Sequence, residues 1–328
     1  MKAAFYERLG AARDVLRVAA LPDPQPAAGE VRVRVQWSGV NPSDVKSRMG
    51  LRNPNIPFPR VIPHSDGSGV IDAVGDGVAK QRVGERVWIW NGAWGRPNGT
   101  ASELVCLPQA QAVPLPESAS GEAGACLGIP ALTALHAVLM DGGVAGKTVF
   151  VAGGAGAVGH YAVQMASQLG AARVITSVST DAKATLAREA GADDVVRYKS
   201  EPLAQRVLEL TQGRGVDRII ELDMAVNGAA DLEMLAPNGE CVVYGSSGTP
   251  LQLPFFPLIA KNVQLKCFIV YNLRPEDRER ANATLTRMLS RGTLQHNIAA
   301  RLPLDDIASA HELVESGKAV GNVVVQVG

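Results

Sequence analysis

A glycine triplet between an apolar segment and a helical pattern constrains the fold of this chain most. Gly154, Gly156 and Gly159 follow the apolar run at residues 148–152 and precede residues 160–170, whose apolar spacing predicts a helix. In this order the missing side chains allow a tight turn, a close backbone approach to a phosphate and close packing of helix on strand. Free N–H groups at the start of a helix also attract anions. The segment is typical of a dinucleotide-binding βα unit; the alternative is a flexible turn without a ligand.

The same strand-and-helix alternation continues beyond the glycine triplet. Apolar strands are predicted at residues 148–152, 173–177, 194–196, 217–221, 240–245 and 263–270, with helical stretches between them. Six such units predict right-handed crossovers and a doubly wound parallel sheet.

The chain before this region has a different pattern. Short strands are predicted at residues 31–40, 67–75, 84–90 and 101–108, and Gly and Pro punctuate them. Residues 31–40 alternate apolar and polar side chains, so this part is expected to be mostly antiparallel and barrel-like. A helix at residues 128–143 is expected to join the two regions. After it, helices at 275–291 and 305–316 and a strand at 322–327 resume the first pattern, so we expect this tail to rejoin the first domain.

Charge and cysteine content limit the classes of partner. Lys plus Arg and Asp plus Glu both number 32, which gives no reason to expect nucleic acid or an anionic membrane as a partner. Cys106, Cys126, Cys241 and Cys267 are far apart and have no metal-ligand spacing, so buried thiols in a reducing compartment are expected. The chain shows no signal-peptide pattern and no membrane-spanning run, and a soluble cytoplasmic protein is predicted.

The end of the second parallel strand indicates which nicotinamide cofactor is favoured. In an NAD site a carboxylate at this place binds the ribose hydroxyls. Here the candidate groups are hydroxyls and cations: Thr176, Ser177, Ser179, Lys183, Tyr198 and Lys199. Such groups suit the 2′-phosphate of NADPH, which a carboxylate would repel. Asp181 is expected to cap the next helix, and it would weaken the preference for NADPH if its side chain turned toward the ribose. The alternative for Lys183 is an ordinary solvated charge.

With both halves described, the chain resembles the medium-chain dehydrogenase/reductase superfamily, and within it the zinc-free quinone oxidoreductases of the ζ-crystallin type. The matching words occur in order along almost the whole chain: GVNPSD at 39–44, PHSDGSGVIDAVGDGV at 63–78, GERV at 84–87, GIPALTALHA at 128–137, VAGGAGAVG at 151–159, AGAD at 190–193, PNGECVVYGSSG at 237–248 and SGKAVGNVVV at 316–325.

The resemblance implies an α/β protein of two domains that meet at a cleft. Residues 1–123 and 271–328 would form a GroES-like, mostly β catalytic domain. Residues 124–270 would form a Rossmann domain that binds NADPH on a doubly wound parallel sheet.

The resemblance also implies the cofactor contacts. They are Asn41, Thr133, Gly154, Ala155, Gly156, Ala157, Val158, Gly159, Ser177, Lys183, Tyr198, Asn227, Gly245, Ser246, Ser247, Phe268, Ile269, Val270 and Asn322. Asp44 would lie near the nicotinamide ribose together with Asn41. By chemistry alone, the alternative for Asn41 is a turn residue beside Pro42, and the alternative for Asn227 is a helix cap.

No metal is expected. Zinc-dependent members of the superfamily have a cysteine where this chain has Asn41 and a His-Glu pair where it has Ser65 and Asp66. His64 is one position away from the zinc-histidine place and lacks a thiolate partner, so it is not expected to bind zinc. Without a Lewis acid, the favoured reaction is hydride transfer from NADPH to an already electrophilic acceptor, such as a quinone or a conjugated enone.

No residue stands out as the general acid, and water could protonate the product. The candidates for the cleft are Asn41, Asp44, His64, Trp88, Trp90 and Trp94. Flat tryptophan faces could stack on an aromatic acceptor, but the alternation in VWIW equally allows two of them to be core residues.

Two other functions stay open at this point. One is an NADPH-dependent enoyl-thioester or enone reductase of the same superfamily. The other is a non-enzymatic, crystallin-like protein that binds NADPH. Residues 262–270 are expected to form an edge strand, which favours a homodimer, and further assembly to a tetramer stays open.

Overall fold

A computed structural model describes residues 1–328 as two units of the chain. The first unit contains Met1–Pro130 and Asn282–Gly328, and the second contains Ala131–Ala281. A π-helical turn, Leu127–Ala131, carries the chain across the first boundary, and α10 (Pro275–Ser290) carries it across the second. No helix is both long and apolar enough to span a lipid bilayer.

The first unit is built on a seven-stranded sheet with β3 near its centre. The sheet order is β14-β15-β3-β4-β5-β7, and β6 also pairs with β3. All pairs are antiparallel except β14 with β15. The strands of this unit are β1 (Lys2–Phe5), β2 (Arg17–Ala20), β3 (Glu30–Val40), β4 (Asp66–Val74), β5 (Arg86–Ile89), β6 (Leu104–Pro108), β7 (Ala112–Pro114), β14 (Ile298–Pro303) and β15 (Asn322–Gln326). The mostly antiparallel sheet agrees with the sequence prediction.

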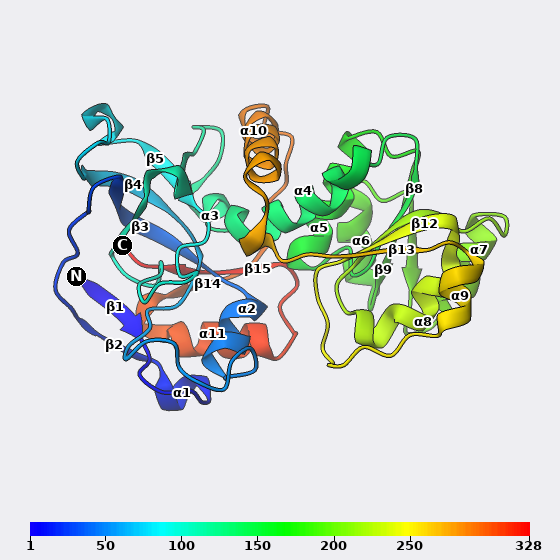
Figure 1. The fold of residues 1–328 in the computed structure, drawn as a ribbon, viewed down its shortest axis with the longest axis horizontal. Helices are drawn as coiled ribbons and strands as arrows, with labels where there is room; N and C mark the ends of the chain where they lie inside the picture. The colour runs from blue at the N-terminus through cyan, green and yellow to red at the C-terminus, as the bar shows by residue number, and fades with distance from the viewer. The chain divides into compact units, whose positions relative to one another are not determined.

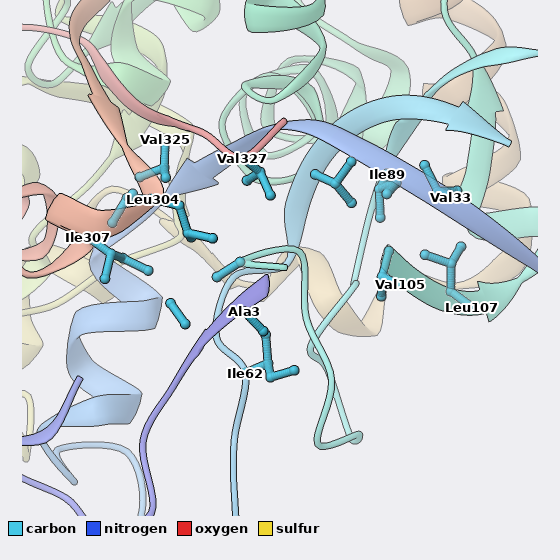
Figure 2. Packing of buried hydrophobic residues seen from close by; sticks show 14 of the residues in the cluster. Ala3, Val33, Ile62, Ile89, Val105, Leu107, Leu304, Ile307, Val325 and Val327 are labelled. Atoms are coloured by element: carbon cyan, nitrogen blue, oxygen red, sulfur yellow. The ribbon is translucent and has the colours of Figure 1, made fainter. Parts of the chain in front are cut away.

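The core of the first unit forms on the apolar face of β3. Val31, Val33 and Val35 are fully buried, because a strand directs alternate side chains to one face. The tail completes this core: β15 pairs with β3, and Leu304, Ile307 and Val325 pack in the same cluster (Figure 2). The tail thus lies in the same unit as the first residues of the chain, but from Asn282 and not from residue 271, and the boundary expected at residues 123/124 lies at Pro130/Ala131.

Short helices accompany this sheet. They are α1 (Ala12–Val15), α2 (Pro42–Arg48), α3 (Gly121–Gly124) and α11 (Ile307–Glu315). The sequence did not predict α1, α2, α3 or strands β1, β2, β7 and β14.

The second unit has a six-stranded parallel sheet (Figure 1). Its order is β10-β9-β8-β11-β12-β13, so the chain reverses direction across the sheet between β8 and β11. The strands are β8 (Thr148–Val151), β9 (Arg173–Val178), β10 (Asp194–Arg197), β11 (Val216–Glu221), β12 (Leu235–Val243) and β13 (Gln264–Cys267). All six were predicted, and the order is that of a dinucleotide-binding sheet. β13 is the edge strand and ends at Cys267, so residues 268–270 follow the strand.

Helices connect these strands. They are α4 (Leu132–Leu139), α5 (Ala157–Gln168), α6 (Asp181–Glu189), α7 (Leu203–Leu210), α8 (Met224–Met234) and α9 (Phe255–Ala260). The helix predicted at residues 128–143 is divided in three: the π-helical turn, α4 and a 3-10 turn at Met140–Gly142. In a parallel sheet of this order, ligands bind outside the carboxyl ends of the strands at the point of reversal, here β8 and β11.

Candidate functional site

The glycine loop lies at this point of reversal, between β8 and α5. Gly156 is the N-cap of α5, and the helix begins at Ala157. The left-handed backbone that the turn requires falls on Gly153, with φ +68°, and not on Gly154, where the glycine spacing predicted it. The N–H groups of Ala157, Val158 and Gly159 are in the first helical turn and have no intrahelical acceptor. They form the anion-binding end of α5.

Two other glycines of the loop have no room for a side chain. A Cβ on Gly154 would overlap the Thr176 side chain, and a Cβ on Gly159 would overlap the Gly153 carbonyl group. Ser177 holds the loop to β9: its carbonyl accepts from Gly154 N at 3.1 Å, and its Oγ accepts from Gly153 N at 3.2 Å. Ser177 therefore fixes the loop and is itself buried.

Polar groups gather after β9 and β10. Thr180 is the N-cap of α6, and its Oγ1 accepts from Lys183 N at 3.3 Å. The expectation that Asp181 caps this helix is wrong: the Asp181 carboxylate pairs with Arg197 Nη1 at 2.8 Å. Arg197 ends β10, and the adjacent Tyr198 is 49% exposed. Sequence reasoning missed Arg197, although it directly precedes Tyr198.

A hydrogen-bond network follows the end of β11. Asn227 lies inside α8 and Asp223 takes the N-cap position, so the helix-cap alternative for Asn227 is wrong. Asn227 Nδ2 donates to Glu221 Oε1 at 2.8 Å, and the backbone N–H of Asp223 donates to the same oxygen. Asp223 Oδ1 accepts from Ser247 N at 2.7 Å and from Ser247 Oγ at 3.0 Å. Glu221 and Asp223 thus connect Asn227 to the 245–248 turn, where Ser246 Oγ donates to the Gly248 carbonyl at 2.8 Å.

A second carboxyl group lies beside Glu221. Glu221 is fully buried and Asp231 is 1% exposed. Burial, and then the charge of Glu221, raise the pKa of Asp231 to about 9, and burial also raises the pKa of Glu221. Neither residue was singled out from the sequence.

Another part of the second unit contains a cavity of about 460 Å³. His136 of α4 contacts the ring of Phe268 edge to face, with centroids 4.7 Å apart. Both residues line the cavity together with Ile269, Cys267 and Arg274, among others. Thr133, one turn before His136 on α4, is buried, as is Val270. Burial lowers the pKa of His136, so its ring is neutral near pH 7.

In the first unit, Asn41 lies between two buried carboxyl groups. Asn41 is the N-cap of α2, with Pro42 at the first helical position, and its backbone N–H donates to Asp44 Oδ2 at 2.8 Å. Its Nδ2 donates to Asp66 Oδ2 at 2.9 Å, and the other carboxyl oxygen of Asp66, Oδ1, has no hydrogen-bond partner. Burial raises the pKa of Asp44 to about 7 and raises that of Asp66 well above its usual value. The helix-capping geometry accounts for the positions of Asn41 and Asp44.

His64 is fully buried and lies with its backbone at φ +76°. Its Nδ1 is 2.8 Å from Ser38 Oγ, and its Nε2 is 2.9 Å from His311 Nε2. Burial lowers the pKa of His64 to about 3 and holds the pKa of His311 well below its usual value. Both imidazole rings are therefore neutral near pH 7. No partner for His311 was visible in the sequence, and this pair supplies one.

The three tryptophans differ in exposure. Trp88 is fully buried in β5, so the core alternative describes this residue. Trp90 is half-buried, and its Nε1 donates to the Ala110 carbonyl at 3.1 Å, whereas Trp94 is 40% exposed. Of the three indoles, only that of Trp94 offers substantial surface to a ligand as placed.

On β15, Asn322 is buried, and its Nδ2 donates to the Asn297 carbonyl at 3.0 Å.

No group of three or more His, Cys, Asp or Glu side chains in residues 1–328 is arranged to hold a metal ion. Asn41, His64 and Asp66, which the sequence analysis weighed against a zinc site, already have hydrogen-bond partners. Asp66 accepts from Asn41, and both ring nitrogens of His64 face hydrogen-bond partners.

Comparison with known protein families identifies both parts of the chain. Residues 27–117 match the alcohol dehydrogenase GroES-like domain, and residues 157–287 match the zinc-binding dehydrogenase family. A quinone oxidoreductase of Pseudomonas aeruginosa is 30% identical over 92% of this chain and 92% of its own length.

Solved structures extend the similarity to the whole fold. An NAD-dependent alcohol dehydrogenase superposes with a TM-score of 0.90 at 30% identity and covers 100% of both chains. An Escherichia coli quinone oxidoreductase complexed with NADPH superposes with a TM-score of 0.88 at 26% identity, over 99% of this chain and 100% of its own. The chain belongs to the medium-chain dehydrogenase/reductase superfamily of oxidoreductases.

Proposed function

We propose that this oxidoreductase transfers hydride from NADPH to a quinone or a similarly conjugated acceptor and needs no zinc. The observation that carries the proposal is the glycine loop at the sheet reversal, next to a β9 end whose nearest carboxylate, Asp181, is paired with Arg197. The quinone oxidoreductase relatives support the acceptor class. Similarity to an NAD-dependent enzyme makes the choice of cofactor the first property to test.

The second unit would hold most of the cofactor. The first-turn N–H groups of α5 would bind the pyrophosphate, with the glycines and Ala155 leaving space for it. Lys183 and Tyr198 would meet the 2′-phosphate, with Ser177 beneath the loop. Arg197 can exchange its bond to Asp181 for one to this phosphate, because the Arg197–Asp181 pair is exposed to solvent and such pairs are weak.

The nicotinamide end of the cofactor would contact the other residues that the resemblance implies. We assign it Asn41, Asp44, Thr133, Asn227, Gly245, Ser246, Ser247, Phe268, Ile269, Val270 and Asn322. Bound NADPH supplies the hydride, and the chain's own residues orient the ring and the acceptor and exclude water. No side chain is assigned as the general acid, and water would protonate the product.

The donor groups support independence from zinc. Asn41 offers an amide where a thiolate would be needed, and its Nδ2 is already bound to Asp66. Hydride transfer to a quinone needs no Lewis acid, because the acceptor is electrophilic by itself. Removing metals with a chelator is therefore expected to leave the rate unchanged, and a loss of rate that added zinc restores would contradict this part.

We also infer that the first unit is the catalytic domain and the second the cofactor domain. A cytoplasmic location and a homodimer formed through the β13 edge remain predictions, and sedimentation tests the second of them.

A direct test mixes the purified protein with NADPH or NADH and with quinones, enones and enoyl thioesters, while the absorbance of the reduced cofactor is followed. Oxidation of NADPH by quinones, faster than oxidation of NADH, is expected. Faster turnover with enoyl thioesters would favour the reductase alternative. Binding of NADPH without turnover of any acceptor would leave the non-enzymatic alternative.

A further inference from the structure

Glu221 and Asp231 form a buried carboxyl pair that the usual contacts do not explain. Asp231 is 1% exposed, and neither of its carboxyl oxygens has a hydrogen-bond donor. Glu221 Oε2 also lacks a donor, whereas Glu221 Oε1 accepts from Asp223 N and Asn227 Nδ2. A buried carboxylate without any donor costs several kcal/mol, so a proton must compensate for the missing partners.

No cation lies against the pair. The ionisable groups that face it are Asp223 at the start of α8, Cys241 on β12 and Tyr244 just after β12. On the neighbouring α7, Arg206 and Glu209 pair with each other at 2.9 Å. After α9, Lys261 Nζ donates to the backbone carbonyls of Leu232, Glu233 and Leu235. Two buried carboxyl groups in this setting cannot both be ionised.

We propose that Glu221 and Asp231 share one proton, and that this protonated pair is a positioning device for the nicotinamide end of the cofactor site. Asp231 donates its proton toward Glu221, and Glu221 stays an acceptor for Asn227 and Asp223. This inference rests on the proposed function in one respect: Asn227 and the 245–248 turn, which the pair positions, are taken to contact the cofactor.

The consequence is a defined geometry of the site wall. Because Glu221 Oε1 takes the Asn227 amide N–H, the Asn227 carbonyl oxygen faces away and can accept from a ribose hydroxyl. Because Glu221 also holds the Asp223 backbone, the Asp223 carboxylate stays in place to bind Ser247. Loss of the shared proton puts two negative charges side by side in the core and separates the pair, which releases both Asn227 and the 245–248 turn.

The test compares NADPH binding by wild type and Asp231→Asn between about pH 7 and about pH 10, by fluorescence titration. The amide that replaces the carboxyl group donates at every pH, so the NADPH affinity of the variant is expected to depend less on pH than that of wild type. The dissociation constant of wild type should rise about tenfold as the pair with a pKa of about 9 ionises. All other groups of the site are the same in both proteins, so their contributions cancel in the ratio of the two dissociation constants. Glu233→Gln, an exposed acid on the same helix, is the matched control and should behave as wild type.

Infrared spectroscopy of the cofactor-free protein detects the proton itself. The difference spectrum between wild type and Asp231→Asn should contain the C=O stretch of a protonated carboxylic acid, and in wild type this band should disappear with the same alkaline midpoint. Equal alkaline loss of affinity in both proteins, or no such band, would overturn the proposal. If wild type binds neither NADPH nor NADH near pH 7, the proposed function fails, and the infrared band still decides whether the pair holds a proton.

Discussion

His64 and His311 meet in the core of the first unit, with their Nε2 atoms 2.9 Å apart and both rings fully buried. One ring must donate and the other accept, so the accepting ring must be neutral, and burial keeps the donating ring neutral as well. The contact joins the segment before β4 to helix α11 of the tail. It therefore makes the attachment of the tail sensitive to acid.

Acid is expected to weaken the fold through this pair. The pKa of His64 is lowered to about 3 when folded, so the unfolded chain binds more protons below its own pKa of 6.5, and stability falls as pH drops through that window. Each histidine that stays neutral in the fold lowers the free energy of unfolding by about 2 kcal/mol as the pH falls from 6.5 to 5. Urea unfolding of wild type and His311→Gln should therefore show a smaller acid loss in the variant.

Asp44 and Asp66 act in the opposite direction over the same pH range, because their raised pKa values favour the protonated folded state. They are present in both proteins, so the difference between the two pH profiles isolates the histidine pair. Parallel profiles for wild type and His311→Gln would show that the pair is not responsible.

Asn41→Asp is expected to destabilise the first unit, because it puts a third carboxyl group between Asp44 and Asp66. The free energy of unfolding should fall by about 2 to 4 kcal/mol, as for other buried polar groups left without a partner. The double variant Asn41→Asp, Asp66→Asn exchanges the amide and the carboxyl and should restore most of this loss. If the exchange restores nothing, the hydrogen bond between these two residues does not carry the stability.

Lys183→Ala tests which cofactor the chain prefers. Removing a charge that meets the 2′-phosphate should raise the dissociation constant of NADPH about tenfold and leave that of NADH unchanged. Arg188→Ala removes an exposed cation from the last turn of the same helix and serves as the control. The same loss with both cofactors, or with both variants, would mean that Lys183 is an ordinary surface charge.

The sequence predicted the parallel sheet well because each of its strands is a short apolar run between turn signals, and the glycine triplet located the first βα unit. The antiparallel sheet was recognised in outline from the alternation in β3. β14 was missed because Ile298–Pro303 alternates half-buried and exposed residues and contains two adjacent alanines before Arg301 rather than a buried apolar face.

Contacts between distant residues could not be predicted from one sequence. His64 and His311 are 247 positions apart, and no periodicity connects them. The turn glycine was misplaced by one residue for a local reason: Gly153 and Gly154 are adjacent, and only the backbone shows that Gly153 has positive φ. Glu221 and Asp231 were passed over because a lone acid in a strand and another in a helix reveal nothing until burial places both in one core.

The affinity of Gly156→Asp for NADPH tests the central claim most directly. A Cβ at this position meets only the Gly153 carbonyl oxygen, at 3.2 Å, so the variant should fold, which circular dichroism and thermal unfolding would check. Its carboxylate would occupy the anion-binding end of α5, and NADPH affinity is expected to fall at least about a hundredfold, or nearly 3 kcal/mol. Gly156→Ala should lose much less. A folded Gly156→Asp protein that binds NADPH as tightly as wild type would contradict the assignment of the cofactor to this loop.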